Sequence, residues 1–296
     1  MDQALDVLLE AAQPLTDGEA GDYDPLLELI GEARLVVLGT ETLGTHELFR
    51  ARAELTRRLV QDRGVTMIAL AADVRAAIAP IDRFARGHSQ QTLAADALAG
   101  LTAFPRWLWR NAEMLDFLGW LRNFNDQFSG DEHKVGVVTT DGVLELAAKT
   151  VVWTHSRDAG DARAADATTP TLGQRARERY RRNAFLVSFS TYRGSMVAAP
   201  RRGDERPRRV ELRPAPAGSL EAMLHDLGLP SFCLPLRDAS ERLRLVLREP
   251  YFERMVDGIY DPEAAPDQPL RARVVDQFDA LVHFDQTRSL EPMETS

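Results

Sequence analysis

Cysteine is almost absent from this sequence, and long apolar runs are missing altogether. Cys233 is the single cysteine among 296 residues, which excludes a disulfide framework and a thiolate zinc cluster and fits a reducing compartment. The first residues lack the basic start and apolar run of a signal peptide. No stretch reaches the roughly 18 uncharged apolar residues that a membrane span needs. We therefore expect a cytoplasmic protein without a membrane segment.

Basic side chains are also fewer than acidic ones. The chain has 36 basic and 45 acidic side chains and a net charge of −9, which argues against general affinity for nucleic acid or anionic membranes. The arginine-rich stretch 175–213 carries no recognisable nucleic-acid-binding module, so we interpret it as a solvated helix and loop. We expect the partner to be a small molecule, with no nucleic acid and no membrane.

Two widespread ligand and catalytic motifs are missing as well. Gly39 and Gly44 do not form a Gly-x-Gly-x-x-Gly pattern, so no dinucleotide site is expected. Ser156 and Ser195 both lie outside a Gly-x-Ser-x-Gly elbow, which argues against a conventional α/β-hydrolase triad.

Short, continuous apolar runs alternate with helical patterns along the chain. Continuous runs are typical of buried parallel strands. One helical stripe contains Leu48, Ala51, Leu55 and Leu59, with Arg52 at its edge, and a second helical region covers residues 107–123. The alternation predicts one α/β domain over residues 1–296, with a mostly parallel sheet flanked by helices. The predicted strands are residues 35–38, 67–70, 135–138, 150–153 and 185–189.

Ligands bind beyond the carboxyl ends of strands in such a sheet, so the residues that follow each strand are the candidates. His46 with Glu47, or His155 with a carboxylate, could supply acid–base chemistry. The structural alternatives are an exposed first helical turn for His46 and a backbone-satisfied ring for His155. The candidates are Glu41 and His46 after the first strand, Asp73 after the second, Asp141 after the third, and His155 and Asp158 after the fourth.

A divalent cation is another interpretation of the same strand ends. Asp141, His155, Asp158 and Asp161 supply oxygen and nitrogen ligands of a suitable kind. Their spacing is not diagnostic, and aspartates in such loops are more often turn formers.

The octet at residues 104–111 is the most unusual stretch of the chain. Trp107 and Trp109 are two residues apart and cannot share a helix face, so one is expected in the core and the other beside a cleft. Arg110 is a candidate anchor for a carboxylate or phosphate. A helix start fixed by aromatic packing is the structural alternative.

Together, nine segments distributed along almost the whole chain resemble the erythromycin esterase family. The resemblance implies an α/β fold and, in active members, hydrolysis of a carboxylic ester such as a macrolide lactone. In such members glutamate and histidine activate water, without a required metal or other cofactor. The segments are residues 22–27, 39–49, 104–111, 151–155, 172–174, 190–194, 218–222, 276–280 and 285–288.

The chain departs from the family's pattern at the residues that handle protons. Thr40 and Leu43 stand where the resemblance places a glutamate and a histidine, and Ala71 replaces a second glutamate. His155 matches a family histidine, whereas Asp158 stands in place of another. Aliphatic side chains cannot accept a proton, so the resemblance implies loss of the original catalytic groups.

A helical insertion of the family is missing near residues 142–149, which implies a cleft more open to water. We predict a degenerate member, a pseudoenzyme in which ester hydrolysis is lost or strongly impaired. One alternative is a rebuilt esterase site with His155 as base and Asp158 as its orienting partner, and a second is a metal- or phosphate-binding module. The predicted substrate-binding residues are Glu41, His46, Asp73, Trp109, Arg110 and Asp141.

Overall fold

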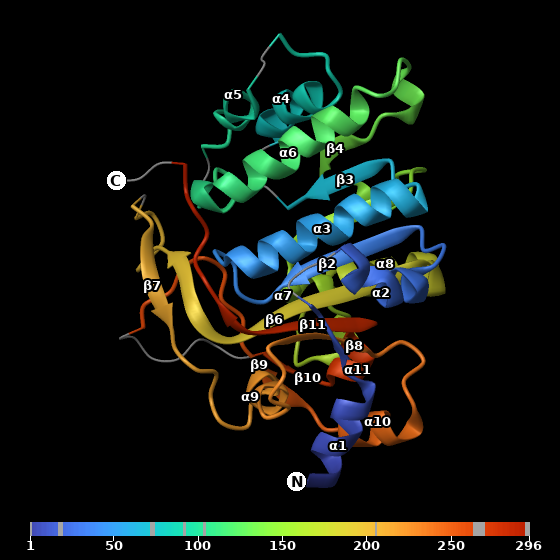
Figure 1. Ribbon diagram of the computed structural model, residues 1–296, viewed down its shortest axis with the longest axis vertical. Helices are drawn as coiled ribbons and strands as arrows, with labels where there is room; N and C mark the ends of the chain where they lie inside the picture. The colour runs from blue at the N-terminus through green and yellow to red at the C-terminus, as the bar shows by residue number, and fades with distance from the viewer. Residues whose placement is uncertain are drawn as a thin grey trace.

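A central β-sheet organises the molecule. The structure, a computed structural model, describes residues 2–16, 20–71, 75–90, 93–102, 105–204, 206–262 and 270–293. Within these ranges, nine strands form one sheet in the order β1-β8-β11-β6-β2-β5-β3-β4, with β7 paired to β6 (Figure 1). The strands are β1 (Gln13–Pro14), β2 (Leu35–Thr40), β3 (Met67–Leu70), β4 (Gly136–Thr139), β5 (Thr150–His155), β6 (Ala184–Ala198), β7 (Arg208–Leu212), β8 (Ser231–Pro235) and β11 (Ala280–Thr287).

The six strands from β4 to β11 run parallel, which confirms the predicted fold class. Antiparallel strands occupy the margins, because β8 pairs with β11, β1 with β8, and β7 with the far end of β6. Outside the main sheet, β9 (Tyr251–Glu253) pairs with β10 (Leu270–Ala272). The carboxyl ends of β2, β3 and β5 therefore lie side by side.

Helices cover both faces of the sheet, and each face has its own apolar core. One layer consists of α2 (Asp24–Ile30), α3 (His46–Arg63), α4 (Arg75–Ala85), α5 (Ala94–Leu98) and α6 (Ala112–Asn125). The other layer consists of α1 (Asp2–Ala11), α7 (Ser156–Ala159), α8 (Leu172–Tyr180), α9 (Leu220–His225), α10 (Glu241–Val246) and α11 (Val274–Gln277). In the described part of the chain, no helix combines the length and the hydropathy needed to cross a bilayer.

Short 3₁₀ turns complete the described secondary structure. The connection from β4 to β5 contains only one such turn, which is how it fits into so few residues. The turns are η1 (Ala20–Tyr23), η2 (Arg106–Leu108), η3 (Asp131–His133), η4 (Val143–Glu145), η5 (Ala162–Ala164) and η6 (Arg181–Asn183).

The helix predicted over residues 107–123 begins later than expected. The chain forms η2 and then starts α6 at Ala112, because the Asn111 side chain accepts a hydrogen bond from the Met114 N–H at 2.7 Å. This side-chain cap fixes the first turn of the helix at that point.

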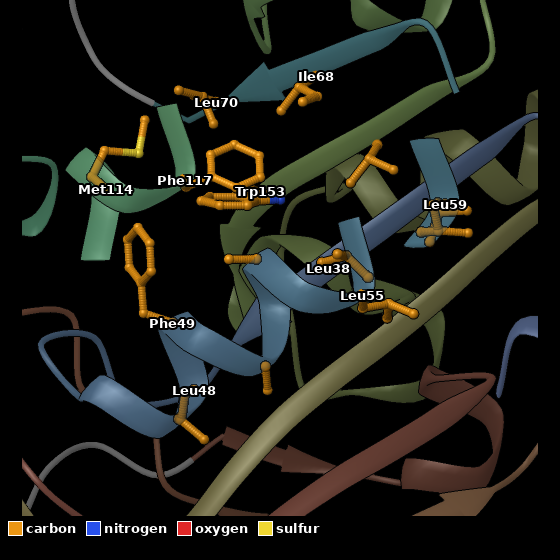
Figure 2. Close-up of a cluster of buried hydrophobic side chains, with 14 of the residues drawn as sticks. Leu38, Leu48, Phe49, Leu55, Leu59, Ile68, Leu70, Met114, Phe117 and Trp153 are labelled. Carbon is orange, nitrogen blue, oxygen red and sulfur yellow. The ribbon is translucent and has the colours of Figure 1, made fainter. Parts of the chain in front are cut away.

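An aromatic cluster fills the core beneath α3. Figure 2 shows Trp153 of β5 flanked by Phe49 of α3 and Phe117 of α6. The Trp153 ring lies 5.3 Å from the Phe49 ring and 4.7 Å from the Phe117 ring, measured between centroids. Its indole N–H donates to the Thr56 hydroxyl at 2.9 Å. The cluster therefore holds the Trp153 side chain in place near the end of β5.

Candidate functional site

A pocket of about 190 Å³ opens at the carboxyl ends of β2, β3 and β5. Its position agrees with the general location of ligand sites in open α/β sheets. Strand-end residues, the start of α3, the segment before α6 and two residues from the C-terminal third line it. They are Thr40, Thr42, Leu43, Gly44, Thr45, Leu48, Phe49, Arg52, Ala71, Leu101, Pro105, Leu108, Trp109, Thr154, His155, Asp257 and Leu290.

Two glycines fix the path of the segment between β2 and α3. A β carbon on Gly39 would lie 2.6 Å from the β carbon of Ala159, so α7 can pack against β2 only at a glycine. Gly44 has φ +87°, and a β carbon there would lie 2.2 Å from the Val197 carbonyl oxygen. With the chain held in this way, Thr40 and Thr42 line the pocket, whereas Glu41 does not.

The pocket contains buried hydroxyl groups without partners. Within the described ranges, neither Oγ1 of Thr40 nor Oγ1 of Thr42 has a hydrogen-bond partner, although both residues are buried. Buried polar groups are normally satisfied, so such a pair at the end of a strand indicates a functional surface.

Arg52 of α3 is the buried cation of the pocket. Its side chain is only 4% exposed, and its guanidinium carbon lies 4.4 Å from the Trp153 ring centroid and 5.2 Å from that of Phe49. Among the described residues, no carboxylate forms an ion pair with it, and its Nε has no hydrogen-bond partner. Burial lowers the pKa of Arg52 to about 9, so the group remains charged at neutral pH.

His155 lies at the end of β5, and among the described residues only its Nδ1 has a hydrogen-bond partner. Its Nδ1 accepts the Arg157 backbone N–H at 3.1 Å, so the ring proton is assigned to Nε2. The Glu41 and Val256 carbonyls come close enough to raise its pKa, but neither meets Nε2 with hydrogen-bonding geometry. Burial outweighs these contacts and lowers the pKa to about 4. The imidazole is therefore neutral and holds no free lone pair for a proton.

Asp158 contacts other groups than His155. One carboxylate oxygen accepts the Leu172 backbone N–H at 2.9 Å, at the start of α8, and the other accepts the Thr154 hydroxyl at 3.5 Å. Asp158 does not line the pocket. The structure thus does not bring together the predicted base and its orienting partner, because Asp158 caps a helix.

Glu41 points to the opposite face of the sheet from the pocket. It is 1% exposed and lies with two other buried glutamates, Glu221 and Glu253. Side chains alternate along a strand, so a position next to Thr40 faces the other layer. Glu41 therefore does not line this pocket, and its contact with a substrate stays a prediction.

Burial and the mutual repulsion of the three carboxyl groups determine how they can be protonated. Burial, followed by the charges of Glu221 and Glu253, raises the pKa of Glu41 well above its ordinary value. Glu41 also forms a hydrogen bond with Glu221. We assign one shared proton to that contact, since one oxygen of each carboxyl otherwise lacks a partner. The other oxygens accept from the Ser188 hydroxyl at 3.1 Å and the Arg254 N–H at 2.7 Å.

His46 is likewise outside the pocket lining. Its Nδ1 contacts a carboxylate oxygen of Glu113 at 2.6 Å, while the Arg288 guanidinium donates to Nε2 at 2.7 Å. The predicted partner Glu47 instead accepts the Arg288 backbone N–H at 2.7 Å. These contacts tie α3 and α6 to the segment after β11, which is a structural role.

The two tryptophans divide as the sequence predicts. Trp107 is 2% exposed and lies in the core, whereas Trp109 lines the pocket. Arg110 is not part of the lining, and its backbone carbonyl accepts the Met293 N–H at 3.0 Å. Asp141 is exposed after the edge strand β4 and does not line the pocket. Asp73 lies outside the described residues.

No group of three or more His, Cys, Asp and Glu side chains suited to a metal is found in the ranges described above. Asp161 forms an ion pair with Arg163 at 2.6 Å, and Asp158 caps α8. These contacts engage two of the three carboxylates of the divalent-cation interpretation.

Sequence reasoning missed Arg52, Thr42 and Asp257 as pocket residues. The available signal for Arg52 was an arginine beside the apolar stripe of α3, a position that packing normally reserves for uncharged side chains. Asp257 is exposed, and it comes from a segment distant in sequence. Its proximity to His155 slightly opposes the fall in the pKa of that ring.

Comparisons with known proteins agree with this architecture. The family model for erythromycin esterase matches residues 60–143 and 137–287. A Bacillus cereus protein of known structure has a TM-score of 0.83 at 16% identity, with 99% of each chain covered. A succinoglycan biosynthesis protein gives 0.79 at 14% identity, with 98% of each chain covered. A mutant of the erythromycin esterase EreC in its open conformation gives 0.59 at 13%, again with 98% of each covered. The structural likenesses show the shared fold, and the family match, which spans most of the sequence, shows that the chain belongs to the erythromycin esterase family.

Proposed function

We propose that this protein binds a small molecule at the strand-end pocket and has lost most of the family's ester hydrolysis. The state of His155 is the observation that carries the proposal. A general base must offer a lone pair to the proton it removes. In this pocket Nδ1 already accepts a backbone N–H and Nε2 carries the ring proton.

Hydrocarbon side chains reinforce this proposal. Leu43 and Ala71, which the resemblance aligns with a catalytic histidine and glutamate, both line the pocket. Neither can take up a proton or stabilise an imidazolium. Asp158 caps α8, so it supports no replacement base in this arrangement.

The test is a hydrolysis assay with 4-nitrophenyl butyrate and erythromycin. We expect the purified protein and its His155→Ala variant to give the same rate as buffer. The Asp158→Asn variant, which keeps an oxygen that can cap α8, serves as the second comparison. Turnover by the natural protein that falls at least tenfold in His155→Ala would overturn the proposal and favour the rebuilt esterase.

A further inference from the structure

Among the described residues, the interior of the pocket presents polar groups that have no hydrogen-bond partner. Arg52 supplies N–H groups without a described counter-charge, and Thr40 and Thr42 supply unpartnered hydroxyls. Asp257 is the one described carboxylate in the lining, and it is exposed and forms no ion pair with Arg52. Arg52 can only donate, whereas each threonine hydroxyl can donate or accept, so the buried charge of the pocket is positive.

Such an arrangement is unfavourable unless something occupies it. A buried cation without a partner forfeits its hydration and gains no Coulombic attraction in return. Stacking on Trp153 and Phe49 provides only partial compensation, since a ring face offers much less than a full negative charge. A group that supplies negative charge and acceptor oxygens would satisfy Arg52 and both threonine hydroxyls together.

We infer that the pocket is a receptor for a small amphipathic anion whose carboxylate binds Arg52 and the hydroxyls of Thr40 and Thr42. A planar guanidinium matches the geometry of a carboxylate, and a charge-assisted hydrogen bond is stronger than a neutral one. The inference rests on the proposed binding function, and it adds the chemical class of the ligand.

The remaining walls define the rest of the ligand. Leu48, Phe49, Leu101, Leu108 and Leu290 give the pocket an apolar surface. One water needs on the order of 10–15 Å³ of such space, so the pocket has room for about a dozen non-hydrogen atoms. That size suits an aryl or short alkyl carboxylate.

The position of the charges sets the orientation. Arg52 is almost fully buried, whereas Leu43 and Trp109 are partly exposed and Asp257 is exposed. The carboxylate is therefore expected to enter first, and the hydrocarbon part to lie toward Trp109. Repulsion from Asp257 disfavours a second negative charge at the mouth.

Calorimetric titration with phenylacetate and its neutral counterpart phenylacetamide tests the inference. We expect the natural protein to bind the acid at least tenfold more tightly than the amide. Arg52→Met should weaken binding of the acid at least tenfold and remove the discrimination between the two. Arg57→Met, on the same helix but outside the lining, is the matched control and should behave as the natural protein.

Phenyl phosphate distinguishes the two sources of an oxyanion. Weaker binding than phenylacetate supports a carboxylate, whereas tighter binding by tenfold or more would overturn that assignment. Circular dichroism and melting temperature establish that Arg52→Met is folded, and Arg52→Lys, which retains charge, should recover part of the preference for the acid.

Two outcomes separate this inference from the proposed function. Equal affinity for phenylacetate and phenylacetamide, or no binding of either, would overturn the inference of an anion receptor. The loss of ester hydrolysis would still be tested separately by the hydrolysis assay. Selective acid binding together with His155-dependent ester turnover would overturn the proposed function, while the carboxylate site would stand as a product site.

Discussion

The two sides of the segment Thr40–Thr42 handle buried polarity in opposite ways. On one side, Glu41 and its neighbours Glu221 and Glu253 are acceptors that become satisfied through a shared proton and nearby donors. On the other side, the pocket presents a buried guanidinium and two hydroxyls for which the described residues supply no partner. Buried polar groups that hydrogen-bond to one another stabilise the fold, whereas polar groups without a partner at a pocket are available to bind a ligand. The comparison therefore separates a structural cluster from a binding site one residue away.

The largest effect should come from removing a member of the carboxyl cluster. Glu221→Ala deletes the acceptor of the Arg254 N–H and the partner of Glu41. A buried donor left unsatisfied costs about 1–3 kcal/mol, so we expect a loss of about 3 kcal/mol in the free energy of unfolding. Urea denaturation measures it, with the exposed Glu249→Ala as control. A loss below about 1 kcal/mol would show that the cluster is not structural.

The next largest effect should be a change in the pH dependence of stability when Glu41 is replaced. The pKa of Glu41 is raised in the folded protein, so its stabilising contribution is complete below the ordinary carboxyl pKa and is lost as pH rises through the raised value. Glu41→Gln mimics the protonated acid and should flatten this alkaline decline, which thermal melts from pH 5 to 9 would record. An unchanged profile would contradict the shared proton.

Arg52→Met should change stability in the opposite direction from Glu221→Ala. It removes a buried charge that has no counter-charge among the described residues, and its cost exceeds the stacking energy that is lost. We expect the free energy of unfolding to rise by about 1 kcal/mol. Urea denaturation of this variant and Arg57→Met gives the answer, and a loss of 2 kcal/mol or more would assign Arg52 a structural role.

The smallest effect on stability is expected when a threonine hydroxyl of the pocket is removed. Thr42→Val preserves the shape of the side chain and removes a donor that has no partner in the structure. Its stability should change by less than about 0.5 kcal/mol. Affinity for phenylacetate should fall about fivefold, in line with one neutral hydrogen bond of about 1 kcal/mol. Unchanged affinity would remove Thr42 from the anion site.

Local sequence patterns predict the parallel core of the fold because each buried strand is a continuous apolar run. The strands β2 to β5 follow these runs closely, whereas β6 continues to Ala198, well beyond the predicted end at residue 189, and the Trp107 and Trp109 pair divides as its spacing requires. The antiparallel margin is different. There β8 pairs antiparallel with β1 and with β11, the last of the parallel strands, and both contacts join residues distant in sequence.

The site is less predictable from the sequence, since its chemistry depends on contacts between residues that are distant in sequence. Residues that follow strands were the right region to inspect, and His155 and Trp109 do line the pocket. However, the residues next to His46 in sequence do not predict its contact with Glu113. Those next to Asp158 do not predict its hydrogen bond with the first N–H of α8. That no described carboxylate pairs with Arg52 is a tertiary property, and no local sequence pattern contains it.

A crystal structure of the complex with phenylacetate is the most direct measurement of the central claim. The account predicts a carboxylate oxygen about 2.8 Å from a guanidinium nitrogen of Arg52, with the phenyl ring directed toward Trp109. A phenyl ring seated against Arg52, with the carboxylate in solvent, would contradict it.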